Sequence, residues 1–345
     1  MPVRLAALAT RVPPHRFSQA EAKAFAEGLF DGHLDEVDRL MPLFDNAGIG
    51  HRYSARPLAW SLEGPGFAER NAASVQAAEE LLAEAARAAL ARAGLAPDAI
   101  DAVVCVCSTG IATPSLDARV AERLGLRADV ERTPIFGLGC AGGTSGLARA
   151  ASLARGNPGS RVLFLVVELC TLTFRLADRS KANLVACALF GDGAAAAVLG
   201  TDLDGPALGA AGEHRWGGTL DVMGWTVEDD GLGVLFSIKI PEIARQKMRA
   251  ATQTFLARHG LGFEAVDRFV CHPGGAKVVE ALEEAFALPD GTLADARAVL
   301  RDYGNMSAAT VLFVLARALK EPGWRRGLVT SMGPGFTGCF QLVER

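Results

Sequence analysis

The sequence lacks several features that would place it in a specialised class of protein. In its 345 residues no apolar run reaches the roughly 18 residues of a membrane span. Arg11, Pro13 and Pro14 interrupt the N-terminal apolar stretch, which therefore lacks the core of a signal peptide. The formal net charge is −4 and no basic block occurs, which argues against nucleic acid as a partner. We expect a cytoplasmic protein without a membrane span.

Cysteine is present, but not in the pattern of a disulfide framework or a metal site. Seven is an odd number, and most of the seven cysteines lie in apolar runs, as is typical of reduced thiols. Cys105 and Cys107 have no second Cys or His pair at metal-binding spacing. We therefore expect no metal site. Hydrophobic residues make up 50% of the chain, which predicts a globular protein with a large core.

The stretch from Ile135 to Leu147 is the most informative part of the sequence. Its apolar start, residues 135–138, predicts a buried strand, and Gly139 allows a tight turn before a helix that extends to about Ala154. Cys140 would lie where the free N–H groups and dipole of a helix favour an anion. A lone cysteine is more often a buried structural residue, but this position predicts a lowered thiol pKa and a nucleophile.

An internal repeat indicates how the chain is organised. Residues 91–105 align with residues 257–271 at an offset of 166, and eight of the fifteen positions are identical. The chain therefore reads as two copies of one helix–strand unit, which we divide into residues 1–209 and 210–345. Strands alternate with helices in both halves, which predicts an α/β fold with a mixed sheet in each.

The repeat also relates two polar residues. With a one-residue slip, Gly139-Cys140 aligns with Gly304-Asn305, and each pair opens a helix. Duplicated halves normally pack about a pseudo-twofold axis, so Cys140 and Asn305 should meet in a central crevice. His272 ends a predicted strand before a Gly-Gly turn, where the first half has Val106. The repeat does not require a histidine there, which indicates a functional role.

Cys140, His272 and Asn305 together supply a nucleophile, an imidazole and an amide donor. The cysteine can carry an acyl group as a thioester, with an imidazolium partner that holds the thiolate. The His and Asn donors can stabilise the enolate that forms when a malonyl thioester loses CO2. Papain-like proteolysis uses the same three residue types, but a doubled α/β architecture with glycine-rich turns does not suggest a peptide-binding cleft.

Motifs around these residues resemble those of the type III polyketide synthases, the chalcone synthase superfamily. The matching segments are Gly139–Gly143, Phe190–Ala195, Cys271–Gly275, Tyr303–Ser307 and Gly333–Phe336. The resemblance extends from about residue 40 to the C-terminus. It implies the thiolase fold, two duplicated halves in a five-layer αβαβα arrangement, and a homodimer. It also implies an acyltransferase in which Cys140 carries the growing chain while His272 and Asn305 promote decarboxylation of malonyl-CoA.

The resemblance extends to the substrate cavity, and most closely to bacterial alkylresorcinol and alkylpyrone synthases. Phe190 matches a gatekeeper phenylalanine, whereas the second gatekeeper position falls on Val234 and lacks the ring, which would widen the passage. The segment from Glu168 to Phe174 resembles those bacterial enzymes, in which a small residue at Cys170 opens a tunnel for a long acyl chain. Ordinary core packing is the alternative role for Cys170, Thr173 and Val234.

Further residues are assigned by the same resemblance. Thr113 matches the position whose side chain lines the partner subunit's cavity, Ser307 lies in the Asn305 motif, and Glu168 is a candidate aid to cyclisation. Arg52 and Lys277 are the candidate contacts for CoA, and basic residues are otherwise few around them. The starter could therefore also come from an acyl carrier protein.

We thus expect a polyketide synthase that loads a long-chain fatty acyl starter, extends it with malonyl-CoA and closes an alkylresorcinol or alkylpyrone ring. No metal or organic cofactor is required beyond the CoA thioester substrates. The alternatives are a ketoacyl synthase of the initiating type, which makes a single condensation with a carrier protein, and a polyketide synthase for short or aromatic starters. An inactive scaffold would lack one of the three site residues, and all three are present.

Overall fold

The computed structural model describes residues 1–30 and 37–345. The helical segment predicted over 18–45 is divided into α1 (Gln19–Phe30), α2 (Val37–Leu40) and α3 (Pro42–Asp45). The prediction for residues 31–36 lies outside the described residues. Among the described residues, no helix is long and apolar enough to cross a bilayer.

A nine-stranded mixed sheet runs through the molecule. Its strands, in order across the sheet, are β11 (Arg268–Cys271), β12 (Arg326–Gly333), β13 (Thr337–Glu344), β8 (Ala207–Arg215), β1 (Val3–Arg11), β7 (Asp192–Gly200), β6 (Arg161–Leu169), β4 (Ala102–Val106) and β5 (Glu131–Ile135). The central strands β1 and β8 pair only through Val3↔Leu208 and Arg4↔Ala207. Because this junction is short, the two halves of the sheet can separate into two layers.

The strand order shows the duplication directly. From the centre outwards, β1, β7, β6 and β4 repeat as β8, β13, β12 and β11. The pairing directions repeat as well, since β4–β6 and β11–β12 are parallel whereas β6–β7 and β12–β13 are antiparallel. Ala102 and Arg268, which open β4 and β11, are separated by the offset of 166 found in the sequence. The predicted pseudo-twofold arrangement is therefore confirmed.

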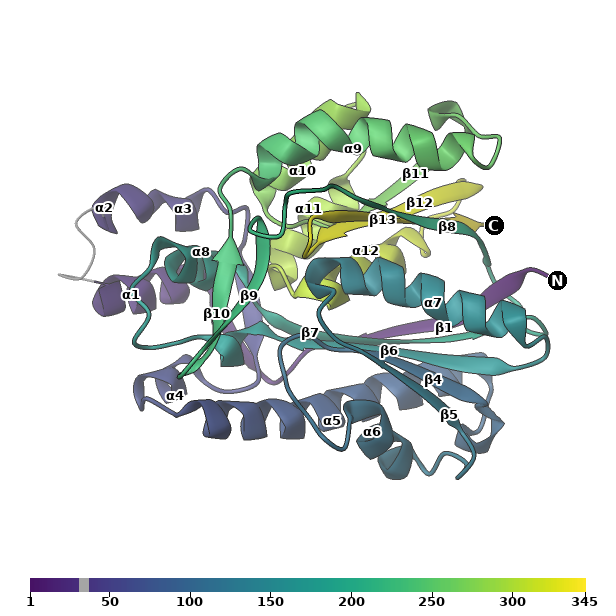
Figure 1. Cartoon of the computed structure of the whole chain (residues 1–345), viewed down its shortest axis with the longest axis horizontal. Helices are drawn as coiled ribbons and strands as arrows, with labels where there is room; N and C mark the ends of the chain where they lie inside the picture. The colour runs from purple at the N-terminus through teal and green to yellow at the C-terminus, as the bar shows by residue number, and fades with distance from the viewer. Residues whose placement is uncertain (31–36) are drawn as a thin grey trace.

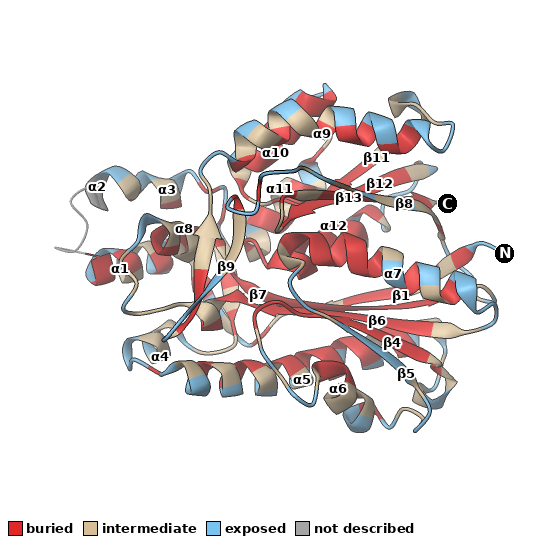
Figure 2. Cartoon of the chain, viewed as in Figure 1, coloured by how far each residue is buried: buried red, intermediate tan, exposed pale blue. Residues whose placement is uncertain are grey.

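Helices complete five layers, which Figure 1 shows from top to bottom. The helices are α9 (Ile240–Ala257) and α10 (Ala276–Phe286) above, α7 (Gly142–Gly156) and α12 (Thr310–Ala318) between the two half-sheets, and α5 (Phe67–Ala93) and α6 (Leu116–Leu124) below. In the middle layer the first half of α7 is buried and its C-terminal turns reach the surface (Figure 2), while α12 is buried from Thr310 to Leu315. The αβαβα order predicted for the thiolase fold is confirmed.

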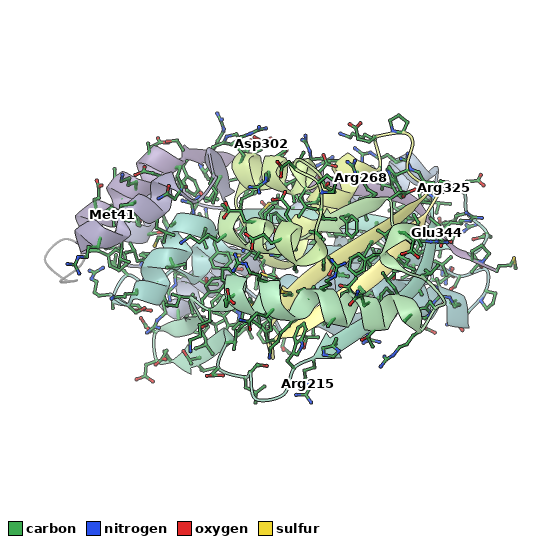
Figure 3. The ribbon with its side chains drawn as sticks, turned by 90° about the horizontal axis from the view of Figure 1, so that it is seen from above. Met41, Arg215, Arg268, Asp302, Arg325 and Glu344 are labelled. Carbon is green, nitrogen blue, oxygen red and sulfur yellow. The ribbon has the colours of Figure 1, made fainter. Side chains whose placement is uncertain are left out.

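Smaller elements surround one end of this core. They are β2 (His15–Ser18), β3 (His51–Ser54), α4 (Leu58–Leu62), α8 (Lys181–Leu189), β9 (Met223–Glu228), β10 (Gly231–Phe236) and α11 (Ala294–Tyr303). In the view from above, Met41 lies at this end of the long axis, and Arg325 and Glu344 lie at the opposite end (Figure 3). The substrate cavities described below are lined partly by these added elements.

One predicted strand is misplaced. The apolar run 135–138 was expected to be a buried strand, but β5 ends at Ile135 and its side chains are largely exposed. Phe136, which follows β5, has 57% of its surface exposed. β5 is the last strand of the sheet and pairs only with β4, so it lies at the edge of the protein.

Candidate active site

The site lies where parallel strands end. β4, β6, β11 and β12 run parallel within their halves, and their carboxyl ends are followed by residues of the site. His272 follows β11, Pro334 follows β12, Ser108 lies two residues after β4, and Glu168 is the next-to-last residue of β6. Open α/β sheets characteristically place ligands outside the carboxyl ends of their strands.

Cys140 is held between the two halves by close backbone packing. It lies in the short 3-10 turn η2 (Gly139–Ala141), where Gly139 has φ +46°, and α7 follows directly. A Cβ atom on Gly143 would lie 2.2 Å from the carbonyl oxygen of Ala308, so only glycine allows α7 to approach the second half. This contact sets Cys140 opposite the turn that carries Asn305.

Asn305 and Ser307 are the hydrogen-bond partners of the Cys140 thiol. The Cys140 Sγ atom lies 4.0 Å from Asn305 Oδ1 and 3.7 Å from Ser307 Oγ. The Ser307 N–H donates to Asn305 Oδ1 at 2.9 Å, and Asn305 Nδ2 donates to the Gly274 carbonyl at 3.2 Å. An amide nitrogen carries two hydrogens, so Nδ2 keeps one donor for a ligand. Ser307 adopts φ +45°, an unusual backbone conformation for a residue with a side chain.

Burial is the largest cause of the pKa shifts of Cys140 and His272. Burial raises the pKa of the Cys140 thiol to about 12, although its hydrogen bonds with Ser307 and Asn305 act in the opposite direction. Burial also lowers the pKa of His272 to about 4. Both shifts disfavour the thiolate–imidazolium pair that the sequence suggests, because burial favours the neutral thiol and the neutral imidazole. Neither ring nitrogen of His272 has a hydrogen-bond partner among the described residues.

Glu168 is a fully buried carboxyl group beside this site. Its Oε2 accepts hydrogen bonds from the Ser108 N–H at 3.1 Å and from Thr109 Oγ at 2.9 Å. Burial raises the pKa of Glu168 to about 8, so the protonated form dominates at pH 7. Its Oε1 has no partner within the described part of the chain. A protonated carboxyl group can donate a hydrogen bond as well as accept one.

A cavity of about 430 Å³ opens onto Cys140. Phe190 and Val234, the two gatekeeper positions, both line it. The sequence analysis missed Phe236, which lies two residues after Val234 on the same face of β10. Its ring meets that of Phe190 edge to face at 6.2 Å, so a second aromatic ring narrows the passage that Val234 alone would widen.

Trp225 is a second lining residue that the sequence analysis missed. It lies on β9 directly opposite Val234, and its Nε1 donates to the Ser108 carbonyl at 3.0 Å. The indole therefore occupies the wall of the Cys140 cavity in a fixed orientation. The turn signal Asp229-Asp230-Gly231 between β9 and β10 could have revealed this hairpin, but not its position over the cysteine.

A larger cavity of about 690 Å³ adjoins the first. Cys170, Phe190 and Val234 line both cavities, and Thr173 lines the larger one. Its other walls come from α1, α8, the 3-10 turn η3 (Cys170–Thr173) and the segment from β3 to α4, and they are largely apolar although Arg52 and Arg56 are among them.

The remaining predicted residues lie outside the Cys140 cavity. Thr113 is exposed, precedes a cis proline and lines a surface groove with Phe136. Lys277 is exposed in the first turn of α10. Arg52 is only 1% exposed, and its guanidinium donates to backbone carbonyls inside the protein. It does not present its charge at the surface, so its predicted contact with CoA phosphates does not fit the structure.

The described residues contain no group of three His, Cys, Asp or Glu side chains that could hold a metal ion. The chemistry available at the site is instead that of a buried thiol, an imidazole, an amide and a protonated carboxyl group. The Cys140 thiol lines the cavity and lies 4.0 Å from Asn305 Oδ1, and a cysteine that faces a cavity continuous with an apolar chamber is suited to acyl transfer through a thioester.

The fold and the site define a class of protein that comparison with known families identifies. The chain belongs to the chalcone and stilbene synthase family, whose N-terminal domain matches residues 56–203 and whose C-terminal domain matches residues 216–343. These enzymes are type III polyketide synthases, acyltransferases that carry out decarboxylative condensation with malonyl-CoA.

Individual relatives agree with this assignment. The 1,3,6,8-tetrahydroxynaphthalene synthase of Streptomyces peucetius subsp. caesius is 40% identical over 352 residues, covering 99% of this chain and 92% of that protein. Type III polyketide synthase A of Arabidopsis thaliana is 32% identical, covering 79% and 73%. The crystal structure of the tetrahydroxynaphthalene synthase of Streptomyces coelicolor A3(2) matches with a TM-score of 0.94 at 28% identity, covering 99% of both chains. None of these three is named as an alkylresorcinol synthase.

Proposed function

We propose that this polyketide synthase loads a fatty acyl starter onto Cys140, extends it with malonyl-CoA, and cyclises the product to an alkylresorcinol or an alkylpyrone. The observation that carries the proposal is the apolar cavity of about 690 Å³ beside the Cys140 cavity. An alkyl chain that enters it exchanges water for apolar walls, which favours binding by about 0.8 kcal/mol for each buried CH₂ group.

In the loading step, the Cys140 sulfur attacks the thioester carbonyl of the starter. His272 accepts the thiol proton and returns it to the sulfur of the departing CoA. The neutral state of His272 before the reaction supports this role, because a protonated imidazole could not accept a proton. The acyl group then remains on Cys140 as a thioester.

In the extension step, malonyl-CoA loses CO2 and the bonding electron pair stays on the acetyl carbon as an enolate. A His272 N–H and the free Asn305 amide hydrogen stabilise the enolate oxygen. The enolate carbon attacks the acyl carbonyl, the bond to Cys140 breaks, and the lengthened chain leaves on CoA for the next cycle. Ser307, whose hydroxyl lies 3.7 Å from the sulfur, contacts the chain at the same point.

Glu168 is proposed to assist ring closure. Its protonated form can donate to a chain carbonyl and polarise it for attack by an enolate or an enol oxygen. Cys170, Thr173 and Val234 are proposed to line the path of the alkyl chain, and Phe190 to guard its entrance. These positions all border the apolar cavity or the passage to it.

Two exposed residues, Lys277 and Thr113, are proposed to take part in substrate binding. Lys277 is proposed to contact the phosphates of CoA, with an acyl carrier protein as the alternative donor of the starter. Thr113 is exposed and lines a groove with the exposed side chains of Phe136 and Ile111. We propose that this face contacts a second copy of the chain in a homodimer. Thr113 would then line the partner's cavity.

A second candidate function is a synthase primed by a small starter such as malonyl-CoA itself. Two observations favour it: the Trp225 indole lines the Cys140 cavity, and the relative at 40% identity is named as a tetrahydroxynaphthalene synthase. A ketoacyl synthase that makes a single condensation is a third possibility, which product stoichiometry distinguishes.

The discriminating experiment incubates the protein with labelled malonyl-CoA, alone or with acyl-CoAs of graded chain length. Long-chain starters should yield labelled products that retain the alkyl chain and contain several acetate units. Products only from malonyl-CoA or from short starters would refute the fatty acyl proposal. Exactly one condensation for each starter would indicate the ketoacyl synthase.

A further inference from the structure

The C-terminal end of α8 is capped by two side chains from a distant part of the chain. The last carbonyl groups of a helix have no partner within the helix and need one elsewhere. Arg52 Nη1 donates to the carbonyls of Cys187 and Phe190, both at 2.7 Å. Gln19 Nε2 donates to the intervening Ala188 carbonyl at 2.9 Å. Three carbonyls at the end of α8 are thus satisfied from outside the helix.

Arg52 suits this position electrostatically. Burial lowers its pKa to about 10, so the guanidinium remains charged at neutral pH. A positive charge at a helix C-terminus is stabilised by the helix dipole. The guanidinium also lies over the Phe17 ring at 4.9 Å, which provides a cation–π contact. Its Nε and Nη2 have no hydrogen-bond partner among the described residues, so the α8 carbonyls are its hydrogen-bond acceptors there.

The capped end of α8 is bonded directly to the catalytic segment. The Asn305 N–H donates to the Leu189 carbonyl at 2.9 Å, and the Gly191 N–H donates to the Asn305 carbonyl at 3.0 Å. Arg52 also packs behind this junction, since a Cβ on Gly304 would lie 2.6 Å from its Cδ. The arginine therefore contacts both strands of the short bridge between Phe190 and Asn305.

We infer that Arg52 is a positioning residue that fixes the Asn305 amide beside Cys140 and the Phe190 ring at the passage, by capping α8 with a buried cation. This inference rests on the proposed function, because it assigns Arg52 to the step in which Asn305 acts. Loading of Cys140 does not require the Asn305 donor, whereas decarboxylation of malonyl-CoA does. Loss of Arg52 should therefore affect the two steps unequally.

The test compares Arg52→Met and Arg52→Lys with wild type in the full-length protein. Decarboxylation is measured as CO2 release from malonyl-CoA alone, and loading as the mass of acylated protein after brief exposure to acyl-CoA. Displacement of a catalytic group by about 1 Å can cost about 100-fold in rate. We expect Arg52→Met to lower kcat for decarboxylation about 10- to 100-fold with a smaller change in KM, and loading to fall less than about threefold. Arg52→Lys, which keeps the charge and can reach a carbonyl, should recover part of the loss.

The matched control is Arg249→Met. Arg249 also places its guanidinium over a phenylalanine ring, Phe263 at 5.0 Å, and donates to a carbonyl near the end of a helix, Ala285 at 3.1 Å in α10. It touches no residue of the site, so its loss should leave both steps unchanged. Gln19→Leu is a second test that keeps the cation and removes the Ala188 contact together with a hydrogen bond to the Phe44 carbonyl at 3.2 Å, and it should give a smaller but equally selective loss.

The outcomes separate the two proposals. The positioning role would be overturned if Arg52→Met lowered the rates of loading and of decarboxylation equally. It would also be overturned if Arg52→Met decarboxylated malonyl-CoA as fast as Arg249→Met does. If Arg52→Met does not fold, an unselective Gln19→Leu overturns it instead. Absence of CO2 release by the wild type would refute the proposed function itself, and the positioning role with it.

Discussion

The stability of the protein should depend on pH through His272. The pKa of this imidazole falls from an ordinary 6.5 to about 4 because the side chain is fully buried without a hydrogen-bond partner among the described residues. Since the folded state binds the proton more weakly than the unfolded chain does, acid favours unfolding. The contribution of His272 is fully present above pH 6.5 and is lost as the pH falls towards 4.

The expected size follows from the two pKa values. At about 1.36 kcal/mol per pH unit, the change from 6.5 to about 4 amounts to about 3 kcal/mol in total. About 2 kcal/mol of this is lost between pH 7 and pH 5. Other groups act in the opposite direction: burial raises the pKa of Glu168 to about 8 and of Asp192 to about 6, so both favour the folded state as the pH falls. The wild-type curve alone therefore does not isolate His272.

A comparison with His272→Gln removes these other contributions, because they are common to both proteins. The assay is urea unfolding at pH values from 5 to 8, followed by circular dichroism. The free energy of unfolding of wild type relative to His272→Gln should fall by about 2 kcal/mol between pH 7 and pH 5. The exposed His259→Gln serves as the control for the loss of a histidine as such.

Two results would refute this reasoning. A difference that stays constant across the range would mean that His272 titrates alike in the folded and unfolded states. A difference that grows as the pH falls would mean that the imidazole is charged in the folded protein. The second result would restore the thiolate–imidazolium pair expected from the sequence.

Three further predictions concern the cavity, ring closure and packing. Phe236→Ala should raise the loading rate of bulky starters more than that of acetyl-CoA, measured by intact-protein mass; equal changes would contradict a gating role. Glu168 ionises above about pH 8, so the ratio of cyclised to linear products should drop there in wild type, whereas Glu168→Gln should show no such drop in chromatographic analysis. Gly143→Ala should cost at least about 2 kcal/mol in urea unfolding, because its Cβ would lie 2.2 Å from the Ala308 carbonyl oxygen. Gly156→Ala in the same helix, where no atom lies within 4 Å, should cost nothing.

The fold could be predicted because the internal duplication is detectable in the sequence. The match between residues 91–105 and 257–271 set the register of β4 and β11, and the structure keeps that offset. The pairing of Cys140 with Asn305 followed from the same alignment, and their side chains lie 4.0 Å apart. A repeat carries long-range information that local propensities do not, since it indicates which segments share an environment.

The parts that were missed depend on contacts that no local pattern encodes. Trp225 and Phe236 reach the cavity through a hairpin whose position over the site is a tertiary property. Burial raises the pKa of Cys140, in the direction opposite to the one that its position at a helix start suggested, and the depth of burial cannot be read from local sequence. Arg52 was assigned to CoA binding by the family resemblance, which does not show that its side chain is buried.

The asymmetry of the site explains why a duplicated fold can perform this chemistry. Around the pseudo-twofold axis, His272 stands where the first half has Val106, and Asn305 stands opposite Cys140. Where the two halves meet, Gly143 of α7 lies so close to the Ala308 carbonyl that position 143 cannot carry a side chain. This contact fixes the distance between the two turns, so each turn can carry a different functional group without losing its alignment with the other. The close contact between Gly143 and Ala308 therefore also sets the catalytic geometry. A substitution that forces these two segments apart should move the Cys140 sulfur away from the Asn305 amide.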